Sequence, residues 1–243
     1  MELFGLAHVV ALAATVVAAA VLAVAGRRAS ASAERRIAFA LAAVLLSNEL
    51  VWQGCRVWIG SWDIRSSLPL HLCDAAIVVC LAALLTRNQV AYELAYFWGL
   101  GGSVQALVTP SVGASFPDYE FFRYFLSHSG IVFVVSYLTF GRRMRPGRGA
   151  VVRTILITAV YMAAVGAIDF LLSANYMFLC AKPPEASLID LLGPWPWYLV
   201  PLTAVGILTI ALLYLPYYVV DRRRRSAELP AATQQSYRPT LPF

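Results

Sequence analysis

The sequence predicts an all-α membrane protein, a bundle of seven transmembrane helices with the N-terminus outside and the C-terminus in the cytoplasm. Of the 243 residues, 60% are hydrophobic and only 13% are charged. The mean hydropathy is +0.70, which is far from the composition of soluble globular domains. Apolar segments recur along the chain and arginines gather in alternate connections, and these two patterns carry the prediction.

Seven apolar segments approach the length that a spanning helix needs, which is about 20 residues. They are Leu6–Ala25, Ile37–Trp58, Leu68–Leu85, Val90–Val108, Phe121–Phe140, Val151–Leu172 and Trp197–Val219. The short connection Thr86–Gln89 makes the third and fourth helices antiparallel neighbours. One helical domain, residues 1–220, therefore accounts for most of the chain.

The distribution of basic residues sets the expected orientation. One set of alternate connections and the C-terminal tail hold Arg27, Arg28, Arg35, Arg36, Arg87, Arg142, Arg143, Arg145, Arg148, Arg153, Arg222–Arg225 and Arg238, whereas the opposite connections hold Arg65 and Lys182. Basic residues concentrate on the cytoplasmic side of membrane proteins. We therefore expect a multi-pass protein of the plasma (cytoplasmic) membrane with its N-terminus outside.

The net charge of +6 does not imply a nucleic-acid partner, because anionic lipids of the inner leaflet suffice as partners for these arginines. Residues 221–243 begin with an arginine run and continue as a polar, proline-containing sequence. This composition predicts a basic, disordered cytoplasmic tail.

Polar residues recur at helical spacing in two of the apolar segments. Residues three and four apart share one face of a helix, and two faces of this kind are formed by Glu49, Trp52, Gln53 and Arg56, and by Glu120, Arg123, Tyr124, Ser127 and His128. Polar faces of this kind are costly to expose to lipid. An alternative stays open for both faces. Glu49 with Arg56, and Glu120 with Arg123, could instead form ion pairs in which the two charges neutralise each other.

The third segment begins with the heptapeptide Leu68–Asp74, LPLHLCD, which contains a histidine, a cysteine and an aspartate. His71 and Asp74 are three residues apart, so the carboxylate could orient the imidazole as a general base. Cys73 points away from His71 on a helix. A base for Cys73 would therefore come from another helix, with His128 as the candidate, or Cys73 packs as a small apolar side chain.

These groups lie at similar depth near the outer ends of their helices, at a rise of about 1.5 Å per residue. Ionisable residues inside a membrane are costly and usually functional. We therefore predict an outward-facing polar site in which Glu49, Gln53, Arg56, Gln105 and Arg123 bind substrate and His71, Asp74, Cys73 and His128 perform chemistry.

No cofactor or metal is predicted. His71, Asp74 and His128 could supply three metal ligands, with His8 as a spare, but no HExxH-like pair accompanies them. A retinal Schiff base is excluded within the helices, because the only lysine is Lys182 in an outer connection. The glycines around Gly99 lie inside an apolar segment, so they favour close helix packing over phosphate binding.

Three segments resemble, in this order, the bacterial YwaF-like integral membrane proteins: Leu68–Asp74, Tyr96–Pro110 (YFWGLGGSVQALVTP) and Phe122–Gly130 (FRYFLSHSG). A more distant resemblance runs to a eukaryotic transmembrane family of lipid acyltransferases that use a cysteine and a histidine. That resemblance implies these roles for Cys73 and His128. In the eukaryotic family the cysteine directly precedes the motif histidine, where this chain has Leu70, so His71 is the closer counterpart.

The function expected from these observations is acyl transfer or hydrolysis on a membrane lipid or another amphiphile, with Arg56 and Arg123 holding an anionic head group. The alternative is a transporter or binding protein for a small anionic solute, in which His128 or Glu49 exchanges a proton. A third reading is a scaffold whose buried polar pairs only specify helix packing.

Overall fold

The computed structural model describes residues 2–110, 113–183 and 188–235, and all regular structure within these ranges is helical. The α-helices are α1 (Leu6–Arg28), α2 (Ala31–Trp58), α3 (Leu72–Thr86), α4 (Gln89–Trp98), α5 (Val104–Val108), α6 (Tyr119–Ser136), α7 (Ala150–Leu172) and α8 (Leu199–Gln235). The π-helical segments are η1 (Gly99–Ser103) and η2 (Tyr137–Gly141), and the 3₁₀ turns are η3 (Tyr176–Phe178) and η4 (Leu188–Leu192). Because η1 joins α4 to α5 and η2 continues α6, the described residues form seven helical rods.

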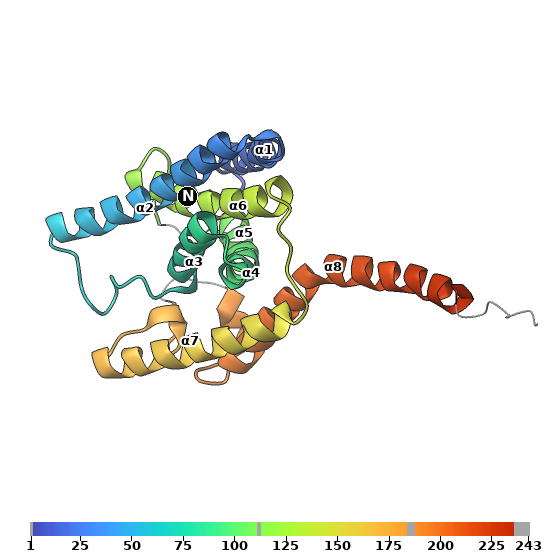
Figure 1. The fold of residues 1–243 in the computed structure, drawn as a ribbon. Helices are drawn as coiled ribbons and strands as arrows, with labels where there is room; N and C mark the ends of the chain where they lie inside the picture. Colours follow the sequence, from blue (N-terminus) through green and yellow to red (C-terminus); the bar gives the residue numbers. More distant parts are fainter. Residues whose placement is uncertain (1, 111–112, 184–187, 236–243) are drawn as a thin grey trace, which may run out of the picture.

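Helix α6 lies in the middle of the bundle. It packs against α1 and α2 on one side and against α3 and α4 on the other (Figure 1). Helices α7 and α8 form the next layer, in which α7 contacts α4 and α8 contacts η1. The helices predicted from the sequence to carry the polar site, α2, α3, α4 with α5, and α6, therefore lie together around the centre of the fold.

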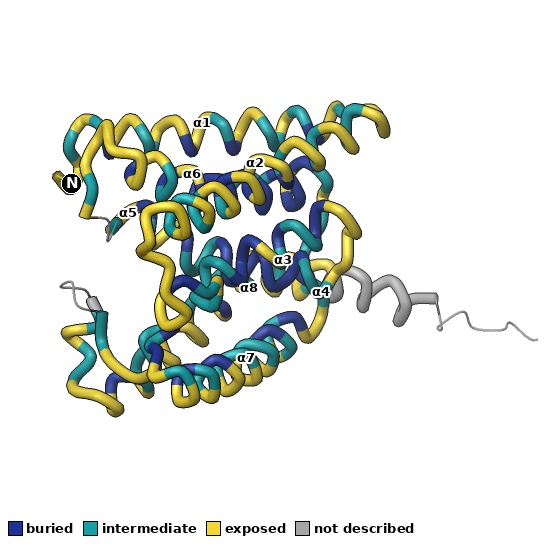
Figure 2. Tube along the Cα trace, turned by 90° about the vertical axis from the view of Figure 1, so that its left-hand side faces the viewer, coloured by how far each residue is buried: buried dark blue, intermediate teal, exposed yellow. Residues whose placement is uncertain are grey.

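The distribution of side chains is that of a membrane protein. Buried residues gather on α3, α4 and α6, whereas few residues of α1, α2 and α7 are buried (Figure 2). The exposed positions are strongly apolar, with Phe39 and Val160 each 71% exposed and Phe170 84% exposed. Extensive apolar surface of this kind indicates contact with lipid or with a partner.

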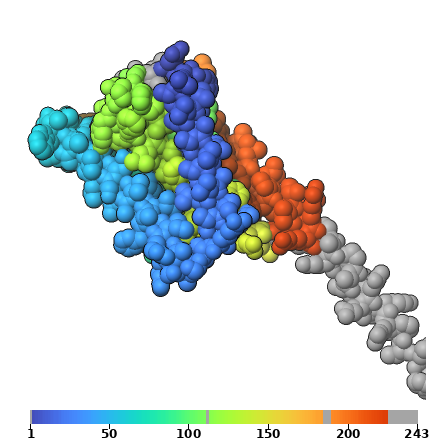
Figure 3. Space-filling model, turned by 90° about the horizontal axis from the view of Figure 1, so that it is seen from above, coloured from blue at the N-terminus to red at the C-terminus, as the bar shows by residue number. Residues whose placement is uncertain are grey.

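Five helices are long and apolar enough to cross a membrane, by length and composition, among the residues described. They are Leu6–Arg28, Ala31–Trp58, Tyr119–Gly141, Ala150–Leu172 and Leu199–Arg224, and Leu72–Thr86 is a shorter apolar helix. The space-filling view from above shows α1 and α2 along one face, with α6 emerging beside them (Figure 3). The chain is therefore an all-helical, multi-pass membrane protein.

Helix α3 begins later than expected. The apolar segment expected from the sequence starts at Leu68, but Leu72 is the first residue of the helix and His71 is its N-cap. Pro69 has no backbone N–H to donate and restricts the residue before it to extended conformations. The Asp74 carboxylate accepts a hydrogen bond from the His71 backbone N–H at 3.2 Å, which caps the new helix end.

Segment η1 lets two helices approach closely, as the glycines predicted. A Cβ atom on Gly99 would lie 2.7 Å from the Ile131 side chain of α6, and one on Gly102 would lie 3.8 Å from Cys73 Sγ. The first of these distances is shorter than side-chain contacts allow. Gly99 is therefore required by the packing of α4–η1 on α6.

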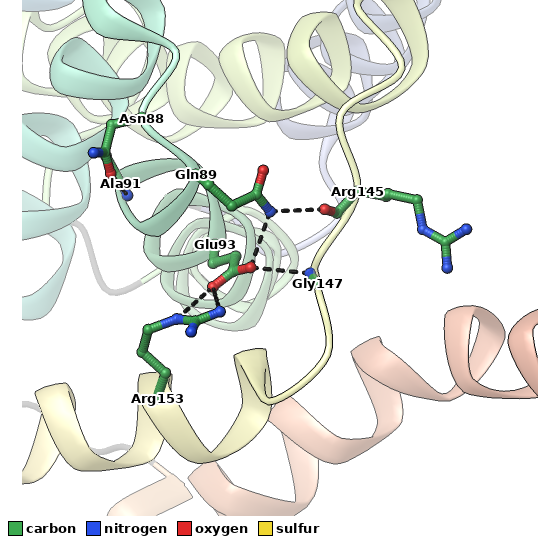
Figure 4. Close-up of polar contacts among 7 residues, drawn as sticks. All are labelled: Asn88, Gln89, Ala91, Glu93, Arg145, Gly147 and Arg153. Atoms are coloured by element: carbon green, nitrogen blue, oxygen red, sulfur yellow. Dashed lines mark hydrogen bonds and ion pairs between the residues drawn. The ribbon is translucent and has the colours of Figure 1, made fainter.

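One buried carboxylate fixes the opposite end of the bundle, and we call its surroundings the Glu93 cluster (Gln89, Glu93, Gly147 and Arg153). Glu93 is 1% exposed. Its Oε1 accepts from Gln89 Nε2 and from Gly147 N–H, each at 2.9 Å, and its Oε2 accepts from Arg153 at 2.6 and 2.9 Å (Figure 4). These bonds join α4, α7 and the connection that precedes α7.

Helix α8 extends further than expected. The last apolar segment expected from the sequence ends at Val219, whereas the helix continues to Gln235. The first part of the expected tail, residues 221–235, therefore has a helical backbone. Residues 236–243 of that tail lie outside the described residues.

Candidate functional site

The three reactive side chains of the heptapeptide face three different neighbours. The imidazole of His71 packs against Tyr176 and Phe178 of η3, each with a ring-centroid distance of 5.5 Å. Its Nδ1 accepts a hydrogen bond from the Met177 backbone N–H at 3.2 Å. Because Nδ1 is the acceptor, a neutral His71 carries its proton on Nε2 and presents a donor there.

Asp169 of α7 supports this arrangement, and the sequence analysis did not include it among the site residues. It is 1% exposed, and its Oδ1 accepts from the Tyr176 backbone N–H at 2.8 Å. Its Oδ2 has no hydrogen-bond partner among the described residues, and the carboxylate is close enough to His71 to interact electrostatically. An aspartate in an apolar helix was the available sign in the sequence.

Tyr176 joins the same region to the connection before α3. Its hydroxyl donates to the Ile64 carbonyl at 2.6 Å and accepts from the Leu68 backbone N–H at 2.9 Å. Burial raises the pKa of Tyr176. The hydroxyl therefore stays protonated and keeps both bonds at ordinary pH.

Asp74 lies within electrostatic range of α2 and α6, and also of Tyr161 on α7. Its carboxylate interacts electrostatically with Glu49, which repels it, and with Arg123, which attracts it. The carboxylate bonds to the His71 backbone and not to the imidazole. No described hydrogen bond joins Asp74 to the His71 ring with which helical spacing pairs it. Glu49 and Arg123 are the charged side chains in electrostatic range of the carboxylate, and we call these three residues the Glu49–Asp74–Arg123 group.

The Glu49–Asp74–Arg123 group retains bonding capacity. Glu49 Oε1 accepts from Gln53 Nε2 at 3.0 Å, but its buried Oε2 has no hydrogen-bond partner among the described residues. The guanidinium of Arg123 lies 4.1 Å from the Trp52 ring centroid, and its buried Nε likewise has no acceptor within the described ranges. Unmet hydrogen bonds on buried charged groups are costly, so Glu49 and Arg123 keep hydrogen-bonding capacity that the described residues do not use.

His128 lies beside Arg123 on α6 and interacts with it electrostatically. Its Nδ1 is 2.9 Å from the Tyr124 carbonyl oxygen. Since a carbonyl can only accept, Nδ1 carries the proton and Nε2 of the neutral ring is a lone-pair acceptor. His128 and His71 are therefore held in opposite tautomers.

Cys73 points toward η1, where its Sγ would lie 3.8 Å from a Cβ atom added to Gly102. It is half-buried and not part of a disulfide. No described hydrogen bond joins it to His71 or His128, so its role as nucleophile or packing residue stays open.

The remaining predicted residues divide between the site and the connection after α2. Gln53 contacts Glu49 and also donates to the Ser67 carbonyl at 3.0 Å. Arg56 does not pair with Glu49 but donates to Ser66 O and Ser66 Oγ, each at 3.1 Å. Gln105 is exposed on α5. Arg56 thus holds the connection, and Gln105 is not brought into the Glu49–Asp74–Arg123 group by any described contact.

Within the described residues, no three histidine, cysteine, aspartate or glutamate side chains are placed to hold a metal ion. His8, the spare ligand of the sequence analysis, uses both ring nitrogens. Its Nδ1 accepts from the Phe4 N–H at 3.0 Å, and its Nε2 donates to the Leu107 carbonyl at 2.8 Å. His8 therefore joins α1 to α5.

Comparison with known proteins gives a family but no described activity. The model of a family described as the TMEM164 family matches residues 3–214. An uncharacterised protein of Treponema pallidum (strain Nichols) is 27% identical over 161 residues, which are 65% of this chain and 64% of that protein. The chain thus covers slightly less than two thirds of that relative. No solved structure matches the chain.

Proposed function

The chain belongs to the TMEM164 family, and we propose that it is an enzyme that transfers or hydrolyses the acyl group of a membrane lipid or another amphiphile. We further propose that all seven helical rods span the plasma membrane, with the N-terminus outside. The Arg123 and His128 side chains would then lie near the outer surface, where the polar site opens outward.

The observation that carries this proposal is the tautomer of His128. Its Nδ1 proton is engaged by the Tyr124 carbonyl, so Nε2 offers a lone pair that can accept a proton. Arg123 stands beside it with an unpaired Nε and can hold a phosphate or carboxylate. A base next to an anion-binding cation suits attack on the ester of an anionic lipid.

His71 takes a different role from the base that its position beside Asp74 suggested. Its Nδ1 is occupied by the Met177 N–H, so its Nε2–H can donate to a substrate carbonyl oxygen. Such donors stabilise the negative charge that develops during acyl transfer. Asp169 and Tyr176 act as positioning residues, because they hold the backbone of η3 against His71.

In the proposed reaction, His128 Nε2 removes a proton from the attacking group, which is the Cys73 thiol or a water molecule. The attacking atom forms a bond to the acyl carbon, and the ester C–O bond breaks. His128 then returns its proton to the leaving alcohol. Water gives a free acid, whereas Cys73 gives a thioester. A second alcohol then gives its proton to His128 and attacks the thioester carbon, the C–S bond breaks, and His128 returns the proton to the Cys73 thiolate.

The test uses the purified chain in lipid nanodiscs with a phospholipid that carries a fluorescent acyl chain. We expect His128→Ala and His128→Gln each to lower the rate at least about 100-fold, because neither side chain is a base. His71→Ala should also lose activity, whereas His71→Gln should retain much of it, because the amide still offers a donor.

Glu120→Gln, an exposed change on α6, is the matched control and should leave the rate unchanged. Cys73→Ala decides between thiol and water as the attacking group. Loss of activity in His71→Gln equal to that in His71→Ala would refute the donor role. A folded wild-type chain that releases and transfers no acyl group from any phospholipid class would refute the enzyme.

A transporter or binding protein for a small anionic solute is the second candidate. It is favoured by the two unpaired buried atoms, Glu49 Oε2 and Arg123 Nε, which could bind an anion and a proton together. Uptake of a carboxylate into proteoliposomes, driven by a proton gradient and lost in Arg123→Gln, would support this function in place of the enzyme.

A further inference from the structure

Two buried serines, Ser127 and Ser129, flank His128 on α6. Successive residues of an α-helix are rotated by about 100°, so the two hydroxyls leave the helix on either side of the imidazole. A buried hydroxyl is costly unless it is hydrogen-bonded. Hydrogen bonds from these serines to neighbouring helices therefore set how α6 is turned about its axis.

Asn48 of α2 bonds α6 on the first side. Its Nδ2 donates to Ser127 Oγ at 2.7 Å and to the Arg123 carbonyl oxygen at 3.3 Å. Asn48 is buried, and the two acceptors lie one helical turn apart. A single amide group thus holds the stretch of α6 that carries both Arg123 and His128.

Thr15 of α1 bonds α6 on the second side. Its Oγ1 lies 2.7 Å from Ser129 Oγ and donates to the Ala11 carbonyl at 2.7 Å. A hydroxyl has one proton to donate. Thr15 therefore gives its proton to Ala11 and accepts the proton of Ser129, which joins α1 to α6 through two buried side chains.

The two bonds determine the direction of His128. The ring leaves α6 on the side opposite to Leu126, which is exposed. His128 shares a helix face with Ile131, and Ile131 lies against Gly99 of η1. With its two serines bonded to α1 and α2, α6 thus presents His128 on the side where it packs on η1.

We propose that Asn48 and Thr15 are positioning residues, which hold α6 in the rotation that directs His128 toward η1 and keeps Arg123 beside it. The role of His128 as the base comes from the proposed function, on which this inference rests. A base must lie within hydrogen-bond reach of the proton that it removes, and a small displacement of a catalytic group is costly in rate. The two bonds thus act on the reaction through His128, without contact with the substrate.

The first test is nitrogen NMR of labelled histidines in the full chain in nanodiscs, which needs no activity. The chain has three histidines. Nδ1 faces a carbonyl oxygen in His128, whereas it accepts a backbone N–H in His8 and His71. Neutral wild-type protein should therefore give one Nδ1–H signal, that of His128, beside two Nε2–H signals.

Asn48→Leu and Thr15→Val each keep the size of the side chain and delete the bond to α6. Each should split the His128 Nδ1–H signal or lower its intensity at least about twofold, because the ring meets other partners when α6 turns. The His71 signal should stay as in wild type. In the fluorescent acyl-chain assay, Asn48→Leu should lower kcat about tenfold.

Thr158→Val is the matched control, because it also deletes a hydrogen bond between two helices. Thr158 of α7 accepts from Trp98 Nε1 of α4 at 2.9 Å, so α6 is not involved. This variant should keep the His128 signal and change kcat less than about twofold. Circular dichroism establishes that each variant is folded.

An unchanged His128 signal in both Asn48→Leu and Thr15→Val would overturn the positioning role. Equal changes of the signal or of kcat in Asn48→Leu and Thr158→Val would show a general effect of stability and would also overturn it. The proposed function fails separately. A chain whose His128 signal responds as expected, but which transfers and releases no acyl group, refutes the enzyme and supports the positioning of His128.

Discussion

Buried carboxylates at the two ends of this bundle differ in how completely their oxygens are hydrogen-bonded. At one end, Glu93 accepts hydrogen bonds from Gln89, Gly147 and Arg153, so both of its oxygens are satisfied. At the other end, Glu49 and Asp74 share the neighbourhood of one guanidinium, and Glu49 Oε2 has no partner among the described residues. A satisfied carboxylate fixes structure, whereas an unsatisfied one keeps bonding capacity for something else.

Hydrogen-bond partners, rather than burial alone, distinguish structural from functional ionisable groups in apolar helices. Insertion into a membrane costs energy for every such group, so the cost alone does not identify function. Hydrogen bonds and ion pairs within the fold offset this free energy for Glu93 in the Glu93 cluster. In the Glu49–Asp74–Arg123 group they offset only part of it. Three substitutions test this contrast, and they follow in order of decreasing effect on stability.

The largest effect is expected for Glu93→Ala. It removes the acceptor of four hydrogen bonds and leaves Arg153 without its carboxylate, and loss of one partner from a buried ion pair costs about 3–5 kcal/mol. Denaturation of the purified chain in bicelles measures this as a lower free energy of unfolding. Glu93→Gln, which keeps one acceptor for Gly147, should lose less, and equal stability of Glu93→Ala and wild type would remove the contrast.

A smaller loss is expected for Tyr176→Phe, which tests the support of His71. The change deletes the hydroxyl bonds to Ile64 and Leu68 and leaves two backbone groups unpaired, at a cost of about 1–3 kcal/mol. The same denaturation assay applies. Tyr218→Phe, a change on α8 outside this region, is the control, and a comparable loss there would argue against a specific role for Tyr176.

The smallest effect is expected for Glu49→Gln. The amide oxygen can still accept from Gln53, and removal of the charge relieves repulsion of Asp74, so the free energy of unfolding should change by no more than about 0.5 kcal/mol. Activity or anion binding should nevertheless fall. A loss of stability as large as that of Glu93→Ala would mean that Glu49 is structural.

The sequence was sufficient for the helical fold because hydropathy and length are local properties of each segment. The turn at Thr86–Gln89 shows this, since Arg87 ends α3 in a left-handed conformation and Asn88 caps α4 through a bond to Ala91 N–H at 3.0 Å. The orientation in the membrane and the division at residue 220 stay predictions.

The site was harder to predict from the sequence than the fold, because its contacts join residues that are distant in the chain. Helical spacing brought His71 and Asp74 together, but Pro69 delays the helix, and the His71 ring turns to Met177, 106 residues away. The importance of Asp169 depends on η3, which has no periodic pattern in the sequence. The YwaF-like resemblance likewise stays an expectation beside the family match.

Segments η1 and η2 bear on how the length of this chain can change during evolution. A π-helical turn accommodates one residue more than an α-helical turn, so deletion of Leu100 within η1 would restore a regular helix and leave the flanking segments α4 and α5 in register. The same deletion in the middle of α7 would rotate every later side chain by about 100°. A chain with one residue fewer in η1 or η2 would thus keep the buried faces on either side of that segment.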